Sequence, residues 1–177
     1  MTTAGEEELL RLTERAPAGA AASGRILLTF DARTRSRLTG RLEDGREVAI
    51  VLSRGTIMRG GDRLVSTDGV VVEVVAASEP LLEVRVSSAA ALARAAYHLG
   101  NRHVAVQVLG HGLRVADDAV LGRMLSGLGL EPVRIDAAFE PEGGAYGDRH
   151  THGDADALSP GAQPHRLSPV IHEFRRL

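Results

Sequence analysis

Three residue types are missing from the chain, and each absence excludes a class of chemistry. There is no cysteine, which excludes disulfides, thiolate metal sites and thiol nucleophiles. There is no lysine, so every basic side chain other than histidine is arginine. Schiff-base chemistry and a P-loop lysine are therefore excluded. Tryptophan is absent and aromatic residues are 3% of the chain, which argues against platforms that stack single-stranded nucleic acid.

The rest of the composition is that of an ordinary folded protein. The 177 residues are 44% hydrophobic, enough for one domain or two small ones. A net charge of -2 gives no basic field toward nucleic acid or a membrane surface. No apolar run approaches the roughly 18 residues of a transmembrane helix, and Met1–Glu14 lacks the features of a signal peptide. We therefore expect a cytoplasmic protein whose available metal ligands are imidazoles and carboxylates.

The first part of the chain predicts a leader and a β-rich domain. Residues 1–22 are expected to be a flexible acidic leader with a short helix over Glu6–Arg15. Residues 23–78 predict a small barrel or sandwich, because short apolar strands alternate with turn signals. The strands are expected at 26–30, 36–42, 47–52, 56–59, 62–65 and 70–75, with Asp-Gly turns at 44–45 and 68–69. Arg33, Arg35, Arg37 and Arg41 are expected on a solvated face; a peptide- or partner-binding face is the alternative.

A different pattern follows a linker expected at Ser78–Pro80. Residues 79–147 predict the order β-α-β-β-α-β, a ferredoxin-like domain. Its strands are expected at 81–86, 103–109, 113–115 and 131–137, and its helices at 89–99 and between 118 and 129. Ser88 suits the start of the first helix, and Gly100 suits the left-handed residue that ends it. Residues 148–177 predict a mobile tail, with a last short helix from Ser168.

Two histidines lie where the first of these helices gives way to the next strand, in the segment Tyr97-His98-Leu99-Gly100-Asn101-Arg102-His103. A histidine at such a junction can be fixed by the backbone and still face outward. His103 is therefore the leading candidate metal ligand. His98 lies in the last helical turn, where a cation suits the helix macrodipole, and is expected to be structural, as are Tyr97 and Asn101.

The other histidines have different surroundings. His150 and His152 stand beside three aspartates, Asp148, Asp154 and Asp156, and predict a flexible chelating arm. His111 is expected to be exposed in a turn, and His165 and His172 to be simple tail residues. Nickel(II) accepts imidazole nitrogen and carboxylate oxygen. Since neutral imidazole binds metal and imidazolium does not, affinity at such a site should fall below roughly pH 6.5.

Three stretches of the sequence resemble the UreE family of urease accessory proteins, which are nickel metallochaperones. They are 94–103 (Arg-Ala-Ala-Tyr-His-Leu-Gly-Asn-Arg-His), 139–147 (Phe-Glu-Pro-Glu-Gly-Gly-Ala-Tyr-Gly) and 52–62 (Leu-Ser-Arg-Gly-Thr-Ile-Met-Arg-Gly-Gly-Asp). The resemblance runs from about Thr29 to His152, and the leader over Thr2–Ala22 is outside it. The family implies a β-rich domain followed by a ferredoxin-like one.

The resemblance also implies a function. It implies a homodimer joined through the C-terminal domain, in which the two copies of His103 share one Ni(II) and tail histidines, His150 and His152, complete the shell. Zn(II) or Cu(II) could take the same site in vitro. The metal would pass to urease through the GTPase UreG and the apoprotein–accessory complex, so the protein would be a chaperone and not an enzyme. Asp117, Asp118 and Ala119 stand where some members carry extra histidines, and the tail has no dense polyhistidine run.

Two other functions compete with this one. A metal-dependent hydrolase could use His98, His103 and a carboxylate, but the chain has no His-Glu-x-x-His or Gly-x-Ser-x-Gly motif; ester turnover abolished by a chelator would favour it. A peptide-binding co-chaperone would use the β-rich domain and bind metal incidentally. Peptide binding that is unaffected by His103→Ala would favour the co-chaperone.

Overall fold

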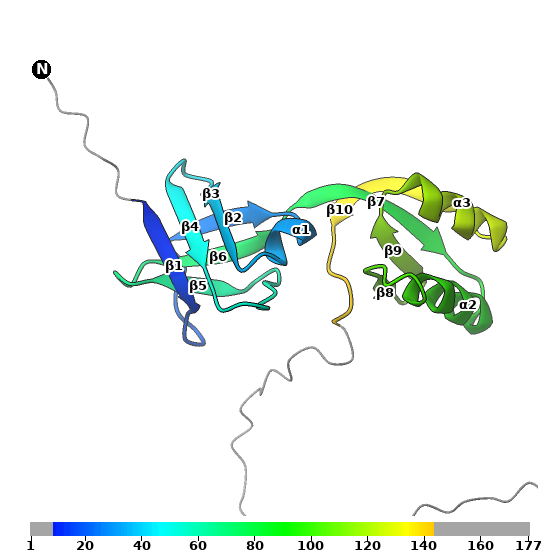
Figure 1. Cartoon of the computed structure of the whole chain (residues 1–177), viewed down its shortest axis with the longest axis horizontal. Coiled ribbons are helices and arrows are strands. Elements are labelled where there is room, and N and C mark those ends of the chain that lie inside the picture. The colour runs from blue at the N-terminus through cyan, green and yellow to red at the C-terminus, as the bar shows by residue number, and fades with distance from the viewer. Residues whose placement is uncertain (1–8, 144–177) are drawn as a thin grey trace, which may run out of the picture. The chain divides into compact units, whose positions relative to one another are not determined.

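The N-terminal part of the chain forms a β-rich domain around one sheet. The computed structural model describes residues 9–143 (Figure 1). The first six strands form a sheet in the order β2-β6-β5-β1-β4-β3. They are β1 (Leu10–Arg15), β2 (Gly24–Leu28), β3 (Arg37–Arg41), β4 (Glu47–Val51), β5 (Arg63–Ser66) and β6 (Val71–Ala76). The β3–β4 and β5–β6 pairs are antiparallel, which confirms the two hairpins expected from their Asp-Gly turns.

The expected helix over Glu6–Arg15 is wrong, because the second half of that segment is a strand. β1 pairs in parallel with β4 and antiparallel with β5. Leu12 is 0% exposed in the domain core, while its neighbour Arg11 is exposed. This alternation of buried and exposed residues has the period of a strand, and burial between two neighbouring strands outweighs the weak helix propensity of the acidic segment.

Two short strands expected in this domain also differ from the structure. The strand expected at 26–30 ends at Leu28, and Phe30–Arg33 form a one-turn helix, α1, whose first turn is capped by Thr29. The strand expected at 56–59 is absent, since those residues lie in no helix or strand. Met58 is nevertheless fully buried, and its N–H donates to the carbonyl of Arg33. That stretch is therefore held by α1 and the core, not by a strand ladder.

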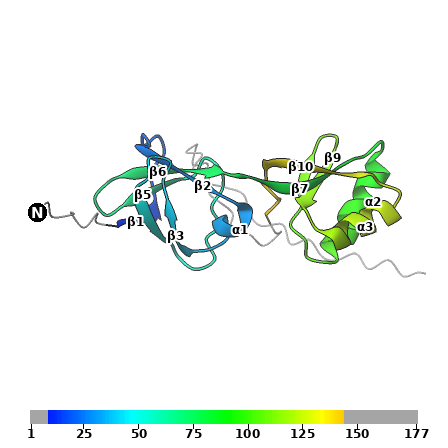
Figure 2. The ribbon, with the colours of Figure 1, turned by 90° about the horizontal axis from the view of Figure 1, so that it is seen from above.

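The C-terminal part of the described chain is a mixed α/β domain. Its elements are β7 (Ser78–Arg85), α2 (Ala89–Gly100), β8 (Gln107–Leu109), β9 (Gly112–Ala116), α3 (Ala119–Gly127) and β10 (Pro132–Ala138). The strands form an antiparallel sheet in the order β10-β7-β9-β8. Both helices lie on the same side of the sheet (Figure 2), where Leu99 of α2 and Leu125 of α3 pack against Leu82 and Leu113. The expected β-α-β-β-α-β order is confirmed.

Two boundaries in this domain were expected elsewhere. The linker predicted at Ser78–Pro80 is wrong: β7 begins at Ser78, so Ala77 alone separates β6 from β7. Pro80 lies within the strand opposite Asp136, and its carbonyl accepts from Asp117 N–H. The strand predicted to begin at His103 begins instead at Gln107, because His103 belongs to the turn that ends α2.

Candidate metal-binding site

The candidate site lies in the hydrogen-bonded turn that ends helix α2. His103 N–H donates to Gly100 O at 2.9 Å, and Val104 N–H donates to Leu99 O at 3.3 Å. These two bonds form the Schellman pattern, which requires a left-handed residue just after the helix. Leu99 is fully buried and Val104 packs against the same core cluster, which supplies the apolar contact that accompanies the motif. The turn is therefore fixed from inside the domain.

His103 itself takes the left-handed position, with φ of 54°, and is the one non-glycine residue with positive φ among residues 9–143. The expectation that Gly100 would do so is wrong, because Gly100 is still helical. Glycine usually fills this place, and an L-residue there costs about 1 kcal/mol. A histidine therefore occupies a strained backbone position, and such outliers cluster at functional sites.

The side chains around His103 are open to solvent. His103, Arg102 and Asn101 are all exposed, and Tyr97 is 65% exposed. The Tyr97 and His98 rings meet edge to face, with centroids 5.3 Å apart. Arg102 Nη1 donates to the His98 carbonyl at 3.4 Å. The junction presents one imidazole outward and a second one partly covered by a tyrosine.

The described residues do not form a complete metal shell. Within 9–143 no three His, Asp or Glu side chains gather where they could hold an ion. Asp118 is occupied as the cap of α3, accepting from Val120 and Leu121 N–H at 2.8 and 2.9 Å, and Asp117 pairs with Arg134 at 3.1 Å. His150 and His152, the predicted tail ligands, lie outside the described residues, as do His165 and His172. Within the described residues, His103 is thus an open candidate ligand without a complete metal shell.

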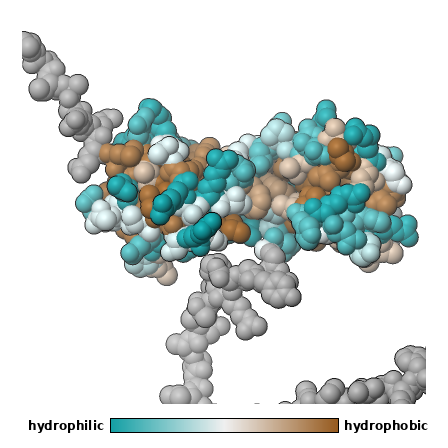
Figure 3. All heavy atoms as spheres, viewed as in Figure 1, coloured by the Kyte–Doolittle hydropathy of each residue, from teal (hydrophilic) through white to brown (hydrophobic). Residues whose placement is uncertain are grey.

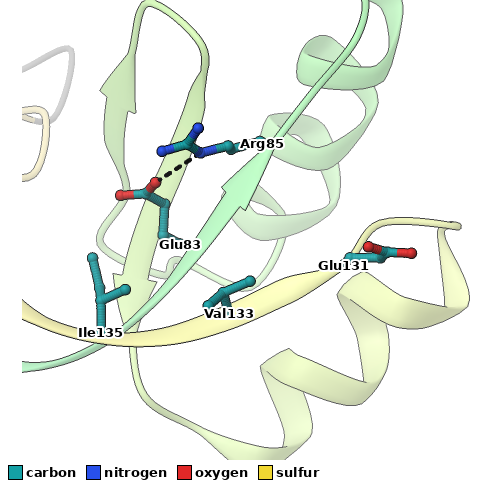
Figure 4. A pocket seen from close by; sticks show the side chains of 5 residues that line it. All are labelled: Glu83, Arg85, Glu131, Val133 and Ile135. Atoms are coloured by element: carbon teal, nitrogen blue, oxygen red, sulfur yellow. Dashed lines mark hydrogen bonds and ion pairs between the residues drawn. The ribbon is translucent and has the colours of Figure 1, made fainter.

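The sheet face opposite the helices carries a charged cluster around Glu83 (Figure 4). The Glu83 side chain is 11% exposed and pairs with Arg114 at 2.8 Å, Arg85 at 3.3 Å and His111 at 3.5 Å. The hydrogen bond from Arg114, more than any other contact, holds the pKa of Glu83 below its usual value. His111 was expected merely to be exposed; it is exposed, but it also faces this carboxylate.

This lowered pKa predicts an acid-sensitive contribution to folding. Glu83 stabilises the native state above its ordinary pKa of 4.5, and that stabilisation is lost as the pH falls through the lower native-state pKa. Glu83→Gln should cost about 1 kcal/mol at pH 7 and should lose less stability than the wild type on acidification. Urea unfolding at pH 7, 5, 4 and 3 measures this. Glu131→Gln, a change on the same face, is the control; equal acid slopes for the wild type and Glu83→Gln would contradict the prediction.

The arginines expected on a solvated face divide into two groups. Arg35, Arg37 and Arg41 are exposed as predicted. Arg33 is 0% exposed, so the expectation for it is wrong; its guanidinium pairs with Glu140 at 2.8 Å. Sequence reasoning assigned no role to Glu140, although it lies in the 139–147 motif that carries the family resemblance. That motif was the available signal, but nothing in the sequence identified Arg33 as its partner.

The described chain is a two-domain protein, with a β-rich domain followed by an α/β domain that carries a solvent-exposed histidine. A family model described as the UreE urease accessory protein, C-terminal domain, matches residues 79–172, and the corresponding N-terminal domain model matches residues 2–77. The match therefore includes Thr2–Ala22, which we expected to lie outside it. No helix in the described part of the chain has the length and apolar character needed to cross a membrane.

Individual relatives agree with the domain matches. The chain is 54% identical over 142 residues to the urease accessory protein UreE of Ralstonia nicotianae, covering 80% of this chain and 64% of that protein. It is 48% identical over 162 residues to UreE of Dechloromonas aromatica, covering 87% and 93% respectively. With UreE of Alkalilimnicola ehrlichii it shares 52% identity over 139 residues, covering 78% and 85%. The chain belongs to the UreE family of urease accessory proteins, which are chaperones and not enzymes.

Proposed function

We propose that this protein is a nickel metallochaperone that delivers Ni(II) for assembly of the urease active site. The name of its relatives, urease accessory protein, supports a role in urease maturation. The observation that carries the metal assignment is His103, exposed and kept in a left-handed conformation at the end of α2. Nickel is the cargo in this proposal, and a solvent-facing ligand suits an ion that must be released.

One imidazole binds nickel weakly, so we propose that two copies of the chain share the ion. A homodimer through the C-terminal domain would bring the two His103 side chains together near a two-fold axis, and His150 and His152 of the tails would complete the shell. Exposed apolar side chains of this domain support a dimer: Tyr97, Val108, Val120 and Val133 are 45–65% exposed. On the face drawn in Figure 3, apolar patches lie among hydrophilic residues.

The remaining assignments follow from this role. We propose UreG and the urease apoprotein–accessory complex as partners, in the cytoplasm, with no nucleic-acid or membrane partner. The C-terminal domain is best classed as ferredoxin-like, a proposal supported by its strand order β10-β7-β9-β8. His98, Tyr97 and Asn101 would support the junction without binding the ion, while Zn(II) or Cu(II) could occupy it in vitro. A peptide-binding role for the N-terminal domain is the second candidate function, supported by a pocket with two exposed arginines, Arg37 and Arg54.

Calorimetric titration of Ni(II) into the full chain tests the metal assignment. We expect about one tightly bound nickel per dimer, because two chains would share each ion. His103→Ala should lose this nickel, because it removes the proposed ligand from both chains. Sedimentation of the same samples establishes how many chains share the ion. One nickel per monomer, or tight binding that survives His103→Ala, would overturn the proposed site. His111→Ala is the matched control, since it removes an exposed histidine from the same domain and should bind as the wild type does.

A further inference from the structure

A fully buried arginine joins the N-terminal domain to the segment that follows β10. Arg33 of α1 donates from Nε to Leu28 O at 3.3 Å and from Nη1 to Met58 O at 3.4 Å, both within its own domain. It also donates to Phe139 O and, at 2.8 Å, to Glu140 Oε1. A guanidinium with no exposed surface needs such a full set of acceptors. Two of its four acceptors belong to residues that lie 106 and 107 positions further along the chain.

The N-terminal domain holds Glu140 with more than this arginine. Gly60 N–H donates to Glu140 Oε1 at 2.8 Å, and Arg59 Nη1 lies 3.5 Å from Oε2 while also donating to Pro141 O at 2.6 Å. A Cβ on Gly60 would lie 2.8 Å from the same carboxylate oxygen, so the site has room for Glu140 because residue 60 is a glycine. Phe139 is 1% exposed and packs edge to face on Phe30.

The same short segment, 139–142, is bonded on its other side to the strand that follows His103. Glu142 N–H donates to Val106 O at 2.8 Å, and Glu140 N–H donates to Gln107 Oε1 at 3.3 Å. Because β10 and β8 are opposite edges of their sheet, the segment crosses from one edge to the other. Figure 1 shows this segment in gold where the chain leaves β10. Val106 is three residues from His103, and Val104 and Val106 both pack on the C-terminal core.

We propose that Arg33 and Glu140 are positioning residues of the metal site. They fix segment 139–142, which in turn fixes Val106 and Gln107, and so they restrain the turn that holds His103 in its left-handed conformation. The N-terminal domain therefore contributes to metal binding without supplying a ligand. This inference rests on the proposed function, since it assigns His103 as a nickel ligand.

Two charge-neutralising changes in the same segment test the proposal. Glu140→Gln removes the carboxylate bound by Arg33, whereas Glu142→Gln alters an exposed side chain and keeps its main-chain bond to Val106. We expect Glu140→Gln to weaken nickel binding by roughly threefold to tenfold, measured by calorimetry on the full chain. It should also speed amide exchange in the metal-free protein over residues 101–107. Glu142→Gln should change affinity less than twofold and leave exchange unaltered.

Gln107→Ala tests the same contact by changing the C-terminal domain residue that bonds to Glu140. It is the second test if Glu140→Gln fails to fold. It removes the acceptor for Glu140 N–H and should speed exchange over residues 101–107 without touching Arg33. The proposal is overturned if folded Glu140→Gln or Gln107→Ala matches the wild type in exchange and in nickel affinity. If the wild type bound no nickel, the proposed function would fail, while exchange in the metal-free variants would still report whether Glu140 restrains the His103 turn.

Discussion

Replacing His103 with glycine is expected to weaken nickel binding by more than about 100-fold and to stabilise the metal-free protein by up to about 1 kcal/mol. The imidazole is the proposed ligand, so its removal leaves each protomer without an anchor for the ion. Residue 103 has φ of 54°, a conformation in which a Cβ collides with the backbone and glycine does not. Nickel affinity should therefore fall while the stability of the metal-free protein rises.

His103→Ala is the matched comparison for this experiment. Alanine also removes the imidazole but keeps the Cβ, so it should lose nickel to the same extent without gaining stability. Urea unfolding of the three metal-free proteins measures the free energy of unfolding, and calorimetry measures nickel affinity. Equal stability of the glycine and alanine variants would show that the turn stores no strain. Nickel affinity that persists in both would remove His103 from the site.

Leu12→Ala is expected to destabilise the protein by about 2–5 kcal/mol. Leu12 is 0% exposed and belongs to β1, which lies between β5 and β4 in the sheet. Truncation at that position removes buried methyl groups and leaves a cavity that neighbouring strands cannot close, because hydrogen-bonded partners hold them on both sides. Thermal and urea unfolding of the full chain measure the loss.

Leu9→Ala serves as the control for that substitution. Leu9 lies just before β1 and is 41% exposed, so the same truncation should change the free energy of unfolding by no more than about 0.5 kcal/mol. If Leu12→Ala were equally mild, β1 would not be part of the core, and the flexible leader predicted from the sequence would describe this segment better than a strand does.

The fold was predictable where short-range chemistry decides it. Asp44-Gly45 predicted the β3–β4 hairpin, and Ser88 predicted the start of α2. The failures occurred where distant contacts decide. Leu10–Arg15 form a strand because β4 and β5 lie on either side of it. Pro80 lies within β7, where it pairs with Asp136 of β10. Neither fact is encoded in the nearby sequence.

The candidate site was likewise predictable from the sequence only in part. His103 could be selected from the sequence because it follows a recognisable helix end and a family motif. Its left-handed conformation could not, since Gly100 three residues earlier was the better local candidate for that role. From the sequence, Arg33 was expected to be exposed like the three arginines that follow it. Its burial depends on Glu140, which lies 107 residues away along the chain.

The single residue between β6 and β7 has a practical consequence for anyone who wishes to study the first domain alone. A fragment cut at Ala77 would end without a spacer and would lack Phe139 and Glu140. Its Arg33 guanidinium would keep Leu28 O and Met58 O but lose the Glu140 carboxylate that pairs with it among residues 9–143. Such a fragment would expose Phe30 and carry a cation that the intact protein neutralises, so its ligand binding would describe an altered molecule.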